Sequence, residues 1–272
     1  MESLHNKFEK TALRFNNDNK LIMQAFINFY GDQHKDYILK KLNESRIIWY
    51  DETNKETEVR NHIISSLPEE IINDCLKKRS EKAFLQSAYI DELDLLILPL
   101  SYDFTHIVHE SNHKVGSHII SSQPLVQING LAYTVEKDNG VIEYDKFLSE
   151  AINQKMTLDI LDELENLGIV TRKTSSWQSY LFPFINLSYD TFKDLLKETF
   201  ISGNLNNFIK LLGEDSYNDF SQLIYLKGFK VRRTLAKGDK PEISQEDISV
   251  IEDLVTEMKL HYDELKVKEA RR

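Results

Sequence analysis

The residues most able to do chemistry lie close together near the middle of the chain. His109 and His113 are four residues apart, and Glu110 directly follows the first of them. On a helix, residues at this spacing lie about 5 to 6 Å apart on one face, so two imidazoles can bind one ion at about 2.0 to 2.1 Å each. Glu110 can then act as general base, because zinc lowers the pKa of bound water towards about 7. The pattern predicts a zinc-dependent hydrolase; the alternative is a solvated helix that carries two histidines by chance.

The sequence on either side predicts the elements that must position this motif. The strongly apolar run 88–98, ended by Pro99, is typical of a buried strand. Ser101 can then cap a helix over residues 102–115, and Gly116 ends it, because glycine tolerates the left-handed conformation past a helix C-terminus. The other faces of this helix carry residues for packing: Phe104, Ile107, Val108, Ser111 and Val115.

Periodicity and turn residues predict the rest of the chain as an α+β front half and a helical back half. Strands are expected at 46–50 and, with a hairpin at Asp138-Asn139-Gly140, within 119–142; a turn is expected at 51–55 and a linker at 237–241. Helices are expected at 19–45 with a break at Gly31, from Pro68 onwards, at 144–167 with Gly168 as the stop, and at 191–200, 205–212 and 248–265, the last capped near Ser244.

The His-Glu-x-x-His run resembles that of the zincin metallopeptidases, and the run 148–153 resembles the third-ligand segment of their glutamate-liganded, gluzincin-like branch. The family pattern there is Asn-Glu-x-x-Ser-Asp or similar; in this chain Ser149 replaces the Asn, and Asn153 stands at the Ser position. The resemblance covers only these two short segments. It implies the following site: Zn²⁺ bound by His109, His113 and Glu150, an open position for water, and Glu110 as general base.

Helix geometry adds an argument for Glu150. Apolar residues on both sides of it anchor the predicted helix to the core, while Glu150 projects from an adjoining face, where burial of a carboxylate is costly unless a cation meets it. The nearby acids need no such cation. Glu136 and Glu143 lie in a predicted hairpin, and Asp145 lies at a helix start, where solvent or the helix dipole accounts for an acid.

Other residues leave alternatives open. The metzincin branch extends the motif to a third histidine three residues after a glycine, and Gly116 fits, but position 119 is Ile119 and His118 comes one residue early. His106 lies about 10.5 Å along the helix from His113, too far to share one ion, so we expect a structural role for it. The zincin resemblance implies a donor to the oxyanion from the later helical part. Tyr180 is the candidate for it, and the alternative is that Tyr180 is a core aromatic.

Composition bounds the partners. The 272 residues carry a net charge of −10, which disfavours nonspecific binding to nucleic acid or to an anionic membrane. Cys75 is the single cysteine and cannot form an internal disulfide. The polar N-terminus has no secretory signal and no stretch is long enough for a membrane span, so the expected location is cytoplasmic; leaderless export would leave no mark in composition. The sequence does not indicate an oligomeric state.

Together these features predict an α+β, zincin-like fold in which a small sheet packs on the active-site helix. The expected parts are an N-terminal helical extension (1–85), a catalytic core (86–168) and a helical C-terminal subdomain (169–272). The expected function is hydrolysis of peptide bonds, with a peptide or protein substrate that pairs with the edge of the strand near 93–98. The alternatives are a zinc hydrolase of small amides, with a small closed pocket, and a catalytically inactive zincin-like binding module.

Overall fold

The computed structural model describes residues 3–43, 45–51, 63–78, 87–122, 125–137, 140–173 and 176–271. In this part of the chain the fold is α+β, as expected, but it has two four-stranded sheets where one small sheet was expected. The chain divides into two compact units, residues 1–115 with 156–174 and residues 116–155 with 175–272. The three consecutive segments expected from the sequence, 1–85, 86–168 and 169–272, stay a prediction.

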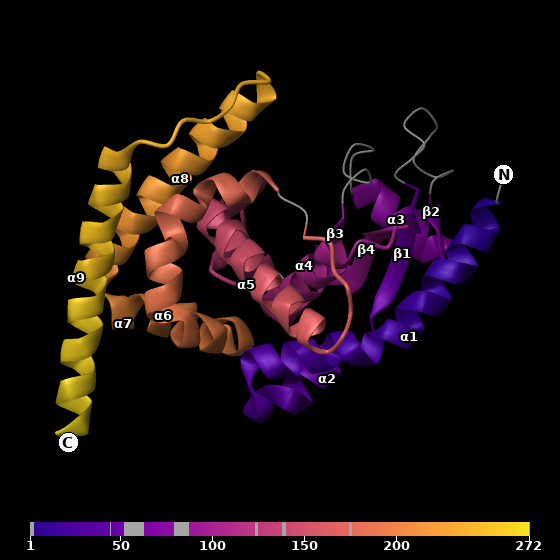
Figure 1. The fold of residues 1–272 in the computed structure, drawn as a ribbon, viewed down its shortest axis with the longest axis horizontal. Helices are drawn as coiled ribbons and strands as arrows, with labels where there is room; N and C mark the ends of the chain where they lie inside the picture. Colours follow the sequence, from indigo (N-terminus) through magenta and orange to yellow (C-terminus); the bar gives the residue numbers. More distant parts are fainter. Residues whose placement is uncertain are drawn as a thin grey trace. The chain divides into compact units, whose positions relative to one another are not determined.

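The first unit combines helices with a mixed sheet (Figure 1). Its elements are α1 (Leu4–Tyr30), η1 (Asp32–His34), α2 (Lys35–Asn43), β1 (Arg46–Tyr50), β2 (Ile63–Ile64), α3 (Glu69–Lys78), β3 (Ala88–Ile90), η4 (Asp91–Leu93), β4 (Leu95–Pro99), α4 (Phe104–Val115) and the later part of α5 (Lys146–Asn166). The break at Gly31 and the strand at 46–50 are confirmed, but α1 begins much earlier than expected, with Ser3 as its cap. Most of the expected turn at 51–55, and the side chain of Cys75, lie outside the described residues.

The sheet of the first unit has the strand order β2-β1-β4-β3. β1 and β4 are parallel, from Arg46 opposite Leu95 to Tyr50 opposite Pro99, whereas β3 and β2 pair antiparallel to their neighbours. All five residues of β4 are buried, as suits a strand with partners on both edges and α4 in contact with it.

The apolar run 88–98 forms a hairpin and not the single strand that we expected. η4 lies between β3 and β4, and Asp94 closes it with a left-handed φ of 48°. Asp91, Glu92 and Asp94 interrupt the apolar run at this turn, so the sequence did carry a signal for it that the single-strand interpretation overlooked. The expected pairing of a substrate with the strand near 93–98 is therefore wrong, since β4 has a strand on each side. Among the described strands, β3 and β2 form the edges of this sheet.

α4 begins at Phe104, two residues later than expected. Asp103, and not Ser101, caps it: the Asp103 carboxylate accepts a hydrogen bond of 2.9 Å from the Thr105 N–H, and its carbonyl accepts one from the Ile107 N–H. An aspartate is as good an N-cap as a serine, so sequence alone could not choose between them. The residues expected to pack are all buried: Phe104, Ile107, Val108, Ser111 and Val115.

The second unit combines an antiparallel sheet with helices. Its elements are β5 (Ser117–Ser122), β6 (Leu125–Asn129), β7 (Ala132–Lys137), β8 (Gly140–Tyr144), the first part of α5, η5 (Trp177–Leu181), α6 (Phe182–Ser202), α7 (Leu205–Leu212), α8 (Glu214–Ala236) and α9 (Gln245–Ala270). The strands pair in sequence order, β5-β6-β7-β8, which confirms the short strands expected within 119–142. Residues 138 and 139 of the expected hairpin turn lie outside the described residues.

Gly116 is needed for a different reason from the one that we expected. Its φ is not among the positive values, so it does not adopt a left-handed cap. A Cβ atom at this position would lie 2.8 Å from Cδ1 of Phe200 and 3.2 Å from the backbone N of Gly130. Gly130 N–H also donates a hydrogen bond of 2.9 Å to the Gly116 carbonyl. The position therefore requires glycine, because the Phe200 side chain and the Gly130 backbone approach it closely.

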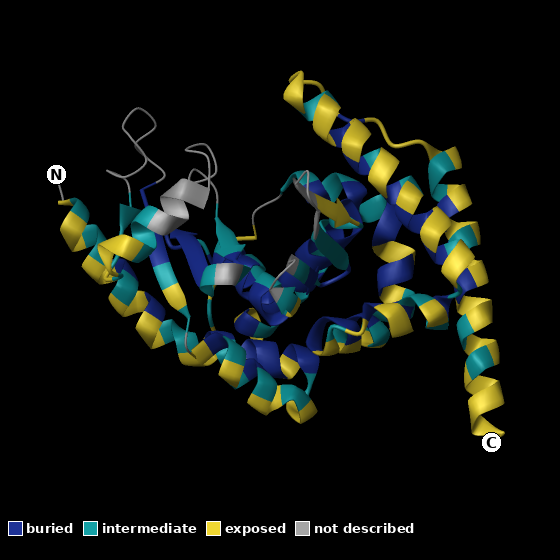
Figure 2. Ribbon diagram, turned by 180° about the vertical axis from the view of Figure 1, so that it is seen from behind, coloured by how far each residue is buried: buried dark blue, intermediate teal, exposed yellow. Residues whose placement is uncertain are grey.

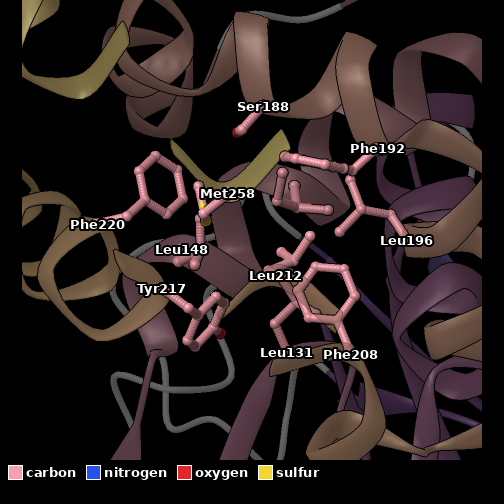
Figure 3. Close-up of a pocket in the computed structure, with 11 residues that line it drawn as sticks. Leu131, Leu148, Ser188, Phe192, Leu196, Phe208, Leu212, Tyr217, Phe220 and Met258 are labelled. Carbon is pink, nitrogen blue, oxygen red and sulfur yellow. The ribbon is translucent and has the colours of Figure 1, made fainter. Parts of the chain in front are cut away.

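The C-terminal helices, the first part of α5 and Leu131 enclose an apolar core in the second unit (Figure 3). Its two hydroxyl groups are already bonded: Ser188 donates to the Ile185 carbonyl, and Tyr217 donates to Asp145. α8 lies in the back half of the chain, which was expected to be helical, although no bounds were given for a helix there. Within it, a Cβ atom at Gly228 would lie 2.5 Å from Cγ of Phe147. α9 is mostly exposed along its length (Figure 2). No described helix combines the length and apolarity needed to span a membrane.

Candidate metal centre

The two histidines of the motif lie side by side on α4. Their ring centroids are 4.8 Å apart with an angle of 86° between the ring planes, and both side chains are half-buried. This is the arrangement that the four-residue spacing predicts, because i and i+4 share one helix face. α4 therefore presents His109 and His113 together.

Glu150 completes a group of possible metal ligands. One ligand atom from each of His109, His113 and Glu150 lies within 4.8 Å of the others, and no other such group occurs among the described residues. Two atoms that are each about 2.1 Å from one ion are at most about 4.2 Å apart. Ligand atoms would therefore have to move by less than about 1 Å for all three residues to bind one ion. Two imidazoles and a carboxylate are donors that zinc prefers. The residues present thus fit the metal.

Thr157 supports one of these histidines. Its hydroxyl lies 3.3 Å from Nδ1 of His109 and its side chain is fully buried. A contact at Nδ1 leaves Nε2 as the nitrogen that can ligate an ion, which is the usual role of such a partner. Glu150 and Thr157 are seven residues apart on the continuous helix α5, so they lie on nearly the same stripe of it. One face of α5 therefore carries both the carboxylate and the support for the histidine.

Glu110 is buried, with 5 % of its surface exposed, on the same helix as the histidines. Ser87, directly before β3, donates a hydrogen bond of 2.9 Å to Oε1 of Glu110. Within the described ranges this hydroxyl is the only polar partner of the carboxylate. A single neutral donor offsets only part of the free-energy cost of burying a carboxylate. A cation bound at the neighbouring His109 would therefore stabilise Glu110.

His106 and His118 have other partners. Nδ1 of His106 lies 2.8 Å from Oδ2 of Asp103, which agrees with the structural role expected for it. Burial alone would raise the pKa of the Asp103 carboxyl, but its hydrogen bonds to His106 and the Thr105 N–H lower the pKa below its ordinary value. Nε2 of His118 lies 2.8 Å from the carbonyl of Phe200, and His118 is not a member of the ligand group.

Tyr180 lies in η5 and is half-buried. Its role as oxyanion donor stays a prediction. Its neighbour Gln178 does reach the group: Nε2 of Gln178 lies 3.4 Å from Oε2 of Glu150. Sequence reasoning missed Gln178, Thr157 and Ser87. Only Thr157 carried a usable signal, since it follows Glu150 by two helical turns.

Comparison with known proteins adds nothing to this site. No model of a protein family, no curated protein and no solved structure matches the chain. The function is therefore argued from the residues and their geometry.

Proposed function

We propose that the chain is a zinc-dependent metallopeptidase. The observation that carries the proposal is the grouping of ligand atoms from His109, His113 and Glu150 within 4.8 Å of one another. It is supported by the buried Glu110 on the helix that bears both histidines. Three ligands of these types leave one position open for water or substrate, which is typical of catalytic and not of structural zinc sites.

The roles of the side chains follow from their chemistry. A bound zinc ion would polarise the scissile carbonyl and lower the pKa of water in the site. Glu110 is the general base, and the protonated Glu110 then donates to the leaving amine. Tyr180 is the candidate donor to the oxyanion, in keeping with the zincin resemblance. Thr157 orients the His109 ring through Nδ1.

The edge strand β3 is the proposed place for the substrate backbone. β3 pairs with β4 on one side only, and extended peptides commonly add to such an edge through main-chain hydrogen bonds. Ser87, which directly precedes β3, bonds to Glu110, so the start of this edge lies next to the general base. This replaces the strand near 93–98 as the expected docking edge.

Zinc content and peptide hydrolysis test the proposal together. We expect the purified protein to hold about one zinc per chain, and His109→Ala or His113→Ala to lose it. Glu110→Gln should keep the zinc while hydrolysis of a peptide library falls by about 10² to 10⁴-fold, because the amide cannot accept the proton. His34→Ala, far from the motif in sequence, is the matched histidine control.

Each other outcome has a definite meaning. Native protein that cleaves peptides without metal would overturn the proposal. Zinc binding without hydrolysis of any peptide would favour the inactive binding module, and turnover restricted to small amides would favour the amide hydrolase. Loss of zinc from Glu110→Gln would show that Glu110 is a ligand and that its assigned role is wrong.

A further inference from the structure

Gln178 is a buried polar side chain whose hydrogen bonding is incomplete. It is 8 % exposed, and its Nε2 donates to Oε2 of Glu150 at 3.4 Å, while its Oε1 has no hydrogen-bond partner within the described ranges. Two residues earlier, the buried Oγ of Ser176 also has no partner among the described residues. Buried polar atoms without partners are uncommon in folded proteins, and those that occur are often linked to catalysis or to a bound ion or water.

The chemistry of the two groups fixes the orientation of the Gln178 amide. An ionised carboxylate only accepts hydrogen bonds, so the NH₂ end of the amide must face Glu150. A flipped amide would place two acceptors against each other. Gln178 thus contacts Oε2 of Glu150 and restrains the position of this carboxylate. The carbonyl end of the same amide then points away from Glu150.

We propose that Gln178 is a positioning residue that works at both ends: Nε2 holds Glu150 for the metal, and Oε1 accepts a hydrogen bond from a main-chain N–H of the bound peptide. This role rests on the proposed function and concerns how the site binds the backbone of its substrate. A peptide is suitable because its backbone offers N–H donors whatever its side chains are. The hydroxyl of Ser176, on the same short segment, can bond to a neighbouring peptide carbonyl.

The 3-10 geometry of η5 keeps this role separate from that of Tyr180. With three residues per turn, residues 178 and 180 point about 120° apart around the helix axis. Gln178 therefore contacts Glu150 without directing the Tyr180 ring to the same place. The 3.4 Å distance is long for a hydrogen bond, and contacts of this kind commonly tighten when substrate is bound.

Zinc affinity tests the Nε2 end independently of activity. In a chelator competition we expect Gln178→Met to weaken zinc binding by about 10 to 100-fold, the usual effect of removing a residue that orients a ligand. Gln178→Asn, which keeps the amide but is one methylene too short to reach Glu150, should give a similar loss. Gln127→Met, at a buried glutamine of β6, is the control. The thermal midpoints of the metal-free proteins show that each variant is folded.

Backbone-modified peptides test the Oε1 end. A good substrate is N-methylated at one position at a time, which removes one N–H donor. At one position, we expect methylation to lower kcat/KM of the wild type about tenfold, mainly by raising KM. For zinc-saturated Gln178→Met, the peptide methylated at that position should have the same kcat/KM as the unmethylated peptide. Wild-type zinc affinity in both variants, or equal sensitivity of wild type and Gln178→Met at every position, overturns the inference. A wild type that neither binds zinc nor cleaves peptides overturns the proposed function instead.

Discussion

Ser87 donates a hydrogen bond of 2.9 Å to Oε1 of Glu110 and so joins the residue before the edge strand to the buried carboxylate of α4. The two residues are 23 positions apart in the chain. The bond occupies one of the two carboxylate oxygens and leaves the other to receive a proton. It also connects the place where a substrate strand would pair with the group that would act on it.

Removal of this hydroxyl should impair catalysis without removing the metal. We expect Ser87→Ala to lower kcat for peptide hydrolysis about tenfold, because Glu110 loses its orienting donor, and to cost about 1 kcal/mol in the free energy of unfolding. Zinc content should stay at the wild-type level. Ser87→Thr keeps a hydroxyl and should restore most of the rate. An unchanged kcat in Ser87→Ala would mean that the bond has no part in catalysis.

Glu150 and His118 should differ sharply in their effects on zinc. We expect Glu150→Ala to lower zinc affinity by more than about 100-fold, because it removes one of the three proposed protein ligands, and Glu150→Gln to do nearly as much. His118→Ala should leave affinity within about twofold of wild type, since Nε2 of His118 bonds to the Phe200 carbonyl. Chelator competition measures both. The reverse ranking would identify the metzincin-like arrangement.

The Thr157 hydroxyl should strengthen zinc binding, because it orients the His109 ring. We expect Thr157→Val, which keeps the shape but removes the hydroxyl, to weaken zinc binding by about 10 to 100-fold. Thr157→Ser should stay close to wild type because it keeps the oxygen near Nδ1. Thr199→Val is the control, since this threonine is also buried but donates to the main-chain carbonyl of Leu195. Equal zinc affinities for the two valine variants would show that the Thr157 contact is unimportant.

Any side chain at position 116 should destabilise the fold, because it would clash with the Phe200 ring. We expect Gly116→Ala to cost about 1 to 3 kcal/mol in the free energy of unfolding, since its Cβ would lie 2.8 Å from the ring. Phe200→Leu should relieve part of this cost, so the two changes should be non-additive in a double-mutant cycle followed by denaturant unfolding. Additive costs would exclude the ring as the cause.

Local patterns predicted the elements of the fold well. The strand at 46–50 has the expected bounds, because its aromatic and β-branched residues favour a strand. The packing residues of α4 are buried as expected. Ser244 caps α9 as its sequence indicates, accepting a hydrogen bond from the Asp247 N–H. The shared face of the two histidines on α4 was also predictable, since four-residue spacing fixes it.

Features set by distant contacts were not predictable. Gln178 contacts Glu150 across 28 positions and Thr157 contacts His109 across 48. Helical periodicity places Thr157 on the stripe of Glu150, but it does not reveal that this stripe meets His109. Gly116 was recognised as special but for the wrong reason, because its constraint comes from Phe200 and not from its own backbone angle. The hairpin within 88–98 was missed for another reason: the acidic residues at its turn, including Asp94, were read as part of one apolar strand.

The first compact unit is interrupted in sequence, because residues 116–155 are synthesised between its two segments. A ribosome adds about 5 to 20 residues per second, so roughly 2 to 10 s separate the synthesis of His109 from that of Thr157. During this interval the strands β5 to β8 emerge, and their local pairing favours early folding. Glu150 and Thr157 are therefore synthesised only after the histidine pair, and under the proposed function zinc would bind late in the production of the protein.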